Sequence, residues 1–154
     1  MFKLSDKSLA KLSGVDAGLQ NVVKTAITIT DVDFGITEGL RSIERQKELV
    51  ATGKSQTLQS NHIIGKAVDL VAYVDGKVSW ELRYYYEIAH AMRVAAIQNK
   101  VPIRWGGAWQ IHDIREWPTS MKSANDNYVE QRRALGKNPF IDSPHFEIGL
   151  LSQI

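Results

Sequence analysis

Apolar side chains recur at helical spacing along several segments of the chain. In residues 15–29 and 81–99 they lie three and four positions apart, which predicts two helices that each bury one face. In the first of these segments the buried face consists of Leu19, Val22, Val23, Ala26 and Ile27. More polar helices are expected over residues 5–13, opened by Ser5 or Asp6, over 42–52, opened by Ser42, and over 120–135.

Shorter segments read as strands, because apolar and polar side chains alternate or β-forming residues cluster in them. The expected strands are residues 34–39, 67–73, 103–105 and 145–148. Asp75-Gly76 follows the second strand and is the strongest two-residue hairpin signal in the chain. The pattern as a whole predicts one α+β domain over residues 1–154, in which a small antiparallel sheet packs against helices.

The composition excludes several classes of protein. The chain has 154 residues and no cysteine, so it forms no disulfide, thiol nucleophile, cysteine zinc finger or iron–sulfur cluster. The net charge is only +2 and there is no long basic run, which argues against nucleic-acid binding. No apolar run approaches the length of about 18 residues that a membrane span needs. The polar N-terminus lacks the apolar core of a signal peptide.

A polar loop before the second predicted strand carries the first candidate metal ligands. His62 lies on this loop, and Asp69 lies inside the strand between two apolar residues. Because strand side chains alternate, Asp69 faces away from the side that its apolar neighbours occupy. Gly65 lets the loop fold back, so that His62 and Asp69 can converge.

The last predicted strand supplies the third candidate ligand, because His145 and Glu147 form one of its faces. If this strand lies beside the strand of Asp69, then His62, Asp69 and His145 can surround one ion. Three protein ligands with a fourth position left to water are typical of catalytic zinc. Asp142 precedes His145 by three residues and can approach that water as a general base without binding the metal.

Four segments resemble the zinc D-alanyl-D-alanine carboxypeptidase and dipeptidase family. The two zinc motifs of that family are similar to Ser60-x-His62-x-x-Gly65-x-Ala67-x-Asp69 and Asp142-x-Pro144-His145-Phe146-Glu147. Two weaker resemblances are Gly39-Leu40-Arg41-Ser42 followed by Gln46, and Arg104-Trp105-Gly106-Gly107-x-Trp109. The four segments lie in the family's order. The family includes phage endolysins that act as L-alanyl-D-glutamate peptidases.

The resemblance implies a hedgehog/D,D-peptidase-like zinc fold. It implies one catalytic Zn²⁺ on His62, Asp69 and His145, with Asp142 as general base. Arg41 would donate to the scissile carbonyl or to the oxyanion that develops from it. Weaker roles, in substrate contact or in orienting the ligands, are implied for Ser60, Gln46, Glu147 and Trp105.

The chain most resembles the endolysin branch, which implies hydrolysis of the L-alanyl-D-glutamate bond in the peptidoglycan stem peptide. Such an enzyme would collect in the cytoplasm of the host bacterium and reach the periplasmic peptidoglycan through a holin. We expect a monomer that inserts into no membrane. Two alternatives stay open: a D,D-carboxypeptidase or D,D-dipeptidase of cell-wall turnover, and a non-catalytic, zinc-stabilised wall-binding module.

Some features depart from the family or have an ordinary explanation. Ala108 stands where the family often has Asp, and residues 111–140 form a longer stretch that can supply a helix or lid beside the cleft. Several candidate residues also have structural readings. These are an ion pair of Arg41 with Glu44 or Glu48, a turn-forming role for Asp142, a surface position for Glu147, a solvated Gln46 and a core position for Trp105.

Overall fold

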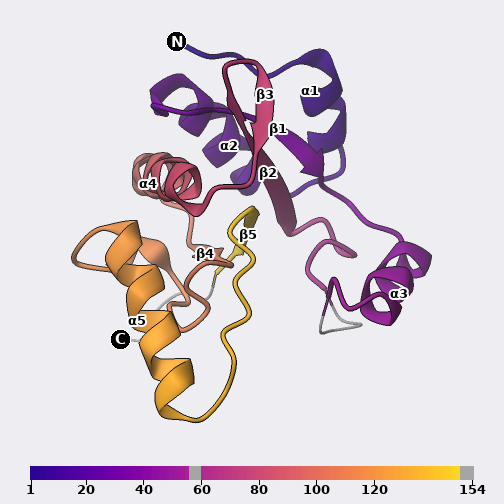
Figure 1. The fold of residues 1–154 in the computed structure, drawn as a ribbon. Coiled ribbons are helices and arrows are strands. Elements are labelled where there is room, and N and C mark those ends of the chain that lie inside the picture. Colours follow the sequence, from indigo (N-terminus) through magenta and orange to yellow (C-terminus); the bar gives the residue numbers. More distant parts are fainter. Residues whose placement is uncertain (56–59, 150–154) are drawn as a thin grey trace.

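An antiparallel sheet forms the centre of the molecule, with helices on both sides of it (Figure 1). The computed structural model describes residues 1–55 and 60–149, so part of the predicted polar segment 54–65 lies outside the described residues. The strand order is β1-β2-β5-β4, and β3 pairs with β2. The strands are β1 (Asp33–Glu38), β2 (Ala67–Val74), β3 (Lys77–Ser79), β4 (Ile103–Trp105) and β5 (His145–Ile148).

Every helix that the sequence pattern predicts is present. The helices are α1 (Asp6–Leu12), α2 (Ala17–Ile29), α3 (Ile43–Ala51), α4 (Leu82–Asn99) and α5 (Met121–Ala134). Side chains of Ser5 and Ser42 accept backbone N–H groups at the starts of α1 and α3, as the sequence predicts. Ser120 caps α5 in the same way, which was not predicted. A short 3₁₀ helix, η1 (Ile114–Glu116), was not predicted, and Asp113 caps it.

The hydrophobic core lies between the sheet and the helices α2 and α4. Leu19 and Val22 on α2, Ile88 and Met92 on α4, and Leu70 on β2 are all fully buried in one cluster. The α+β class and the small antiparallel sheet are therefore confirmed, whereas the extent of the domain over residues 1–154 stays a prediction. Among the described residues, no helix is both long and apolar enough to cross a membrane.

The predicted hairpin is also present. Asp75 and Gly76 connect β2 to β3 and have φ angles of 52° and 75°. Two successive positive φ angles are the mark of a type I′ turn, whose twist matches that of the strands it joins. This hairpin lies at the end of β2 that is remote from Asp69.

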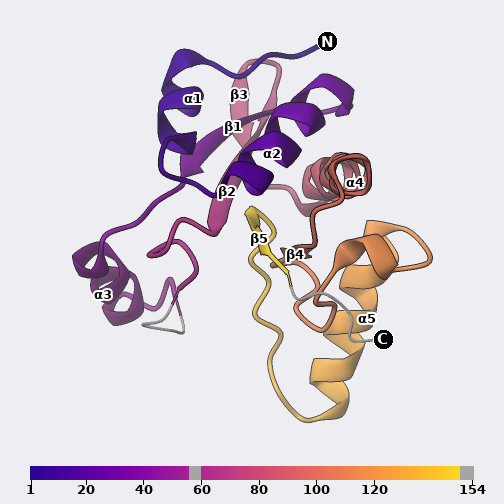
Figure 2. The same cartoon turned by 180° about the vertical axis from the view of Figure 1, so that it is seen from behind.

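Strand register places polar side chains in a row across the other end of the sheet. In the antiparallel pairings, Asp69 of β2 lies opposite Glu38 of β1 on one side and His145 of β5 on the other. A register irregularity between Ile36 and Glu38 precedes this row. Figures 1 and 2 show that α3 and α5 lie on opposite sides of β5, so the row of polar residues lies between them.

Candidate metal centre and active site

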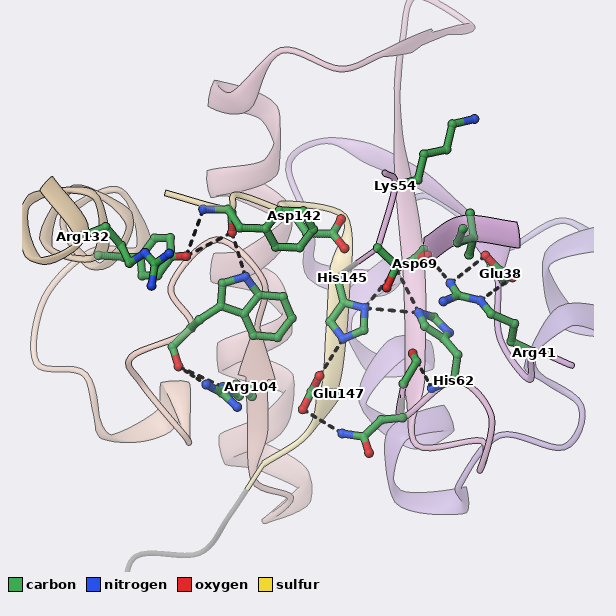
Figure 3. A pocket seen from close by; sticks show the side chains of 17 residues that line it. Glu38, Arg41, Lys54, His62, Asp69, Arg104, Arg132, Asp142, His145 and Glu147 are labelled. Atoms are coloured by element: carbon green, nitrogen blue, oxygen red, sulfur yellow. Dashed lines mark hydrogen bonds and ion pairs between the residues drawn. The ribbon is translucent and has the colours of Figure 1, made fainter. Parts of the chain in front are cut away.

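Three ligand atoms from distant parts of the chain converge at this end of the sheet (Figure 3). Nε2 of His62 lies 3.2 Å from Oδ1 of Asp69 and 3.2 Å from Nδ1 of His145, and the same Nδ1 lies 3.3 Å from that oxygen. His62 and His145 are almost completely buried, and Asp69 is largely so. The structure thus brings together the three residues that the sequence proposes as ligands.

The far side of each imidazole fixes which nitrogen carries a proton. Nδ1 of His62 lies 2.8 Å from the carbonyl oxygen of Gly39, which can only accept, so this nitrogen donates. Nε2 of His145 lies 2.7 Å from Oε1 of Glu147 and donates to that carboxylate. When both rings are neutral, the two nitrogens that face Asp69 therefore present lone pairs, an arrangement found around metal-bound histidines.

The dimensions of the ligand triangle fit zinc. Tetrahedral zinc with bonds of about 2.0–2.1 Å separates neighbouring ligand atoms by about 3.3 Å. The three separations here are 3.2, 3.2 and 3.3 Å. Two imidazoles and one carboxylate also form a common ligand set for catalytic zinc, with a fourth position left for water or substrate. The residues could therefore hold one zinc ion.

Without a metal, the same triangle has to hold a proton. Three acceptors so close together repel one another unless a positive charge lies among them. Burial alone would lower the pKa of His145, but its hydrogen bonds with Asp69 and Glu147 outweigh burial and raise that pKa to about 10. Burial likewise acts to raise the pKa of Asp69, yet the bonds with His145 and His62 lower it. Without a metal, the protonated form of His145 beside the ionised Asp69 is therefore favoured.

Arg41 lies behind this triangle and is bound on three sides. Its Nε and Nη2 donate to both carboxylate oxygens of Glu38, at 2.7 and 2.8 Å. Its Nη1 donates to Gln46 at 2.6 Å, and Nη2 lies 3.3 Å from Oδ2 of Asp69, the oxygen that faces away from the histidines. The pairings with Glu44 and Glu48 that spacing allowed are not formed. The role of Arg41 as an oxyanion donor stays a prediction.

A pocket of about 550 Å³ opens over the three candidate ligands. Asp142 lines this pocket, and Figure 3 shows it next to His145. Within the described part of the chain, no donor lies within hydrogen-bonding distance of its carboxylate. Burial and the negative charge of Asp69 raise the pKa of Asp142, against the opposing charges of His145, His62 and Arg41. Asp142 is thus a carboxylate beside the metal position that is free to exchange a proton.

The residues with weaker predicted roles differ in where they lie. One lines the pocket, one holds Arg41, and one is in the core. Ser60 lines the pocket, and its hydroxyl accepts the backbone N–H of His62 at 3.2 Å. Gln46 is fully buried and holds Arg41, so it is not a solvated helix residue. Trp105 is fully buried against Phe146 and donates to the carbonyl of Ser143, which places it in the core and outside the pocket wall.

Several residues of the site carried no clear signal in the sequence. Glu38 clamps Arg41, and its spacing of three residues was the only available hint. Asn61 lies inside the first zinc motif and donates to Glu147 at 2.8 Å. Other pocket residues come from elements whose orientation the sequence left open: Leu49, Lys54, Arg104, Trp109, Tyr128, Arg132 and Phe140.

The small antiparallel sheet thus carries, at the base of a pocket, a His–Asp–His group that could bind one metal ion. A carboxylate with no hydrogen-bond partner among the described residues lies beside it. Such a group could serve a hydrolase that uses one metal ion. Residues 1–148 match the family model of phage L-alanyl-D-glutamate peptidases. The chain belongs to this family.

Individual relatives agree with the family match. The chain is 30% identical over 112 residues to the L-alanyl-D-glutamate peptidase of Escherichia phage T5, a match that covers 70% of this chain and 82% of the relative. It is 27% identical over 103 residues to the peptidoglycan L-alanyl-D-glutamate endopeptidase CwlK of Bacillus subtilis, covering 58% and 62% of the two chains. The crystal structure of the Serratia marcescens L-Ala D-Glu endopeptidase ChiX superposes with a TM-score of 0.70 and 37% identity, covering 95% of this chain and 90% of ChiX.

Proposed function

We propose that this chain is a zinc peptidase that hydrolyses the L-alanyl-D-glutamate bond of the peptidoglycan stem peptide. The observation that carries the zinc assignment is the triangle of His62, Asp69 and His145, whose edges match tetrahedral zinc and whose nitrogens, when both rings are neutral, present lone pairs. The names of the relatives support the substrate and the bond. They favour this activity over a D,D-carboxypeptidase, a D,D-dipeptidase and a non-catalytic wall-binding module.

Five residues would hold the ion or orient its ligands. His62, Asp69 and His145 would hold the ion, while Gly39 and Glu147 fix the two imidazoles in the ligating form. When bound there, zinc would supply Lewis acidity to polarise the scissile carbonyl and to make a bound water more acidic.

Asp142 lies where it can take a proton from the attacking water. As general base it would accept that proton and pass it to the leaving amine of the D-glutamyl residue. Because no partner in the described residues occupies its carboxylate, Asp142 would have no such hydrogen bond to break before it acts. Arg41 would hold Asp69 in position from behind.

Digestion of purified peptidoglycan, followed by mass spectrometry of the fragments, tests the proposal. We expect new amino groups on D-glutamate, loss of activity with a chelator, and recovery with one equivalent of zinc. Release of free D-alanine would instead identify a D,D-carboxypeptidase. Failure of the zinc-loaded, folded protein to cut peptidoglycan at all would leave only the wall-binding alternative.

The variant Asp142→Asn separates catalysis from metal binding. It should bind zinc as the wild type does, while kcat falls by a factor of about 10² to 10⁴, the usual contribution of a general base. Unchanged activity in this variant would exclude Asp142 as the base. The monomeric state, the absence of a signal peptide and release through a holin stay predictions.

A further inference from the structure

Most acidic side chains of the pocket have positively charged partners, but some of its basic side chains form no ion pair. Glu38 and Asp69 are neutralised by Arg41 and the histidines, and Glu147 is bonded to His145 and lies opposite Arg104 in the strand pairing. Three further cations line the pocket, and one of them, Arg104, faces the negative charge of Glu147. The other two are Lys54 and Arg132. Neither forms an ion pair within residues 1–55 and 60–149.

Arg132 supplies a guanidinium on the α5 side of the pocket. It lies in the last turn of α5, one helical turn after Tyr128, so that both side chains face the pocket. Its Nε and Nη2 donate to the carbonyl oxygen of Asn138 at 3.2 and 3.1 Å, which fixes the guanidinium while Nη1 stays available. The next residue, Arg133, is exposed and does not line the pocket.

Lys54 extends the positive charge to the other side of the pocket. It follows α3, and its backbone N–H donates to the carbonyl of Leu49 at 2.8 Å. Figure 3 shows Arg132 far to the left of the His62–Asp69–His145 triangle and Lys54 above Asp69, away from Arg132. A peptide that crosses the triangle from α3 to α5 therefore passes a cation on either side.

The chemistry of the substrate, if the proposed function holds, supplies a matching anion. Glutamate has two carboxyl groups, and a peptide that continues from one of them leaves the other free. We propose that Arg132 is a specificity-determining residue that binds this free carboxylate of the D-glutamyl residue, with Lys54 adding long-range attraction. A guanidinium forms strong, charge-assisted hydrogen bonds to a carboxylate and much weaker ones to a carboxamide. The enzyme should therefore discriminate against stem peptides amidated at D-glutamate.

Two preparations of insoluble peptidoglycan test this inference, one with the D-glutamyl carboxylate free and one with it converted to a carboxamide. We expect the zinc-loaded wild type to cleave the free form about 10- to 100-fold faster, the usual size of one lost charged hydrogen bond. Arg132→Gln should reduce this preference to near one by slowing cleavage of the free form. Arg132→Lys should keep part of the preference. Arg133→Gln is the matched control and should keep all of it.

The possible failures are distinguishable from one another. Equal cleavage of both preparations by the wild type overturns the inference and leaves the proposed function standing. A preference that survives in Arg132→Gln also overturns the assignment to Arg132. No cleavage of either preparation by folded, zinc-loaded protein refutes the proposed function itself. Zinc affinity equal to that of the wild type shows that Arg132→Gln leaves the metal site intact.

Discussion

Nη2 of Arg41 lies 3.3 Å from Oδ2 of Asp69, so the guanidinium contacts the carboxylate oxygen that does not face the histidines. The other oxygen, Oδ1, is left to point at His62 and His145. Arg41 itself is fixed by the two-pronged contact with Glu38. Through these contacts Arg41 orients Asp69, a candidate metal ligand, in addition to any contact that Arg41 makes with substrate.

Replacing Arg41 should therefore weaken metal binding. We expect Arg41→Gln to lower zinc affinity by about 10- to 100-fold, the usual effect of losing a residue that orients a ligand. It should also destabilise the fold by up to about 3 kcal/mol, because Glu38 loses its partner. Competition with a chromophoric chelator measures the affinity, and circular dichroism checks the fold. Arg45→Gln, at an exposed arginine nearby, is the control. A lower kcat with unchanged zinc affinity would support the oxyanion role alone.

Glu147 orients the second histidine and should also affect the metal. Its carboxylate accepts from Nε2 of His145 at 2.7 Å, and this bond lowers the pKa of Glu147 against the opposing effect of burial. Glu147→Gln can keep the acceptor but loses the charge that strengthens His145 as a ligand. We expect zinc affinity to fall by about tenfold, and Glu147→Ala to have a larger effect.

The control for Glu147 is Glu130→Gln, which changes an exposed carboxylate of α5. It should leave zinc affinity unchanged in the same chelator competition. If Glu147→Ala binds zinc as tightly as the wild type, then the hydrogen bond to His145 does not tune the metal site.

Binding of zinc should release a proton. In the metal-free protein the pKa of His145 is raised to about 10, so at neutral pH its ring carries the extra proton among the three ligand atoms. Because zinc needs the lone pair of Nδ1, this proton must leave when the metal binds. Zinc affinity should thus rise with pH, by about tenfold per pH unit below the pKa of His145, and level off above it.

Calorimetry in buffers of different ionisation enthalpy measures this release directly. At neutral pH we expect about one proton per zinc ion. The control His90→Gln changes an exposed histidine on α4 and should not alter the number. An affinity that does not depend on pH, with no proton released, would show that the triangle is already free of protons before the metal arrives.

Much of the candidate metal centre could be predicted from the sequence because its geometry is local or periodic. Because side chains alternate along β2 and β5, Asp69 and His145 each face away from the apolar residues next to them in their own strand. The antiparallel pairing of the two strands then makes Asp69 and His145 neighbours. His62 needs only a short loop to return to Asp69. These relations depend on spacing along the chain, which the residues themselves display.

The remainder of the pocket depends on how whole elements are oriented. Trp105 and Trp109 follow one another closely in the sequence, yet Trp105 lies in the core because β4 pairs with β5, and Trp109 lines the pocket. Arg132 and Arg133 are adjacent on α5, and only the rotation of that helix decides which one faces the pocket. Which of these side chains face the pocket depends on packing between distant segments, and the local sequence pattern does not predict it.

The loop that carries His62 depends on a glycine that tolerates no side chain. Gly65 has a φ of 70°, and a Cβ atom there would lie 2.4 Å from the backbone oxygen of Gly14. Gly53 has a similar φ of 78° but open space around it, so Gly53→Ala should cost only the strain of about 1 kcal/mol. Gly65→Ala should cost clearly more and should also weaken zinc binding, because the loop must move away from Gly14. Urea unfolding and chelator competition measure the two effects. Equal losses of stability in both variants, with zinc affinity unchanged in Gly65→Ala, would show that this close backbone contact does not position His62.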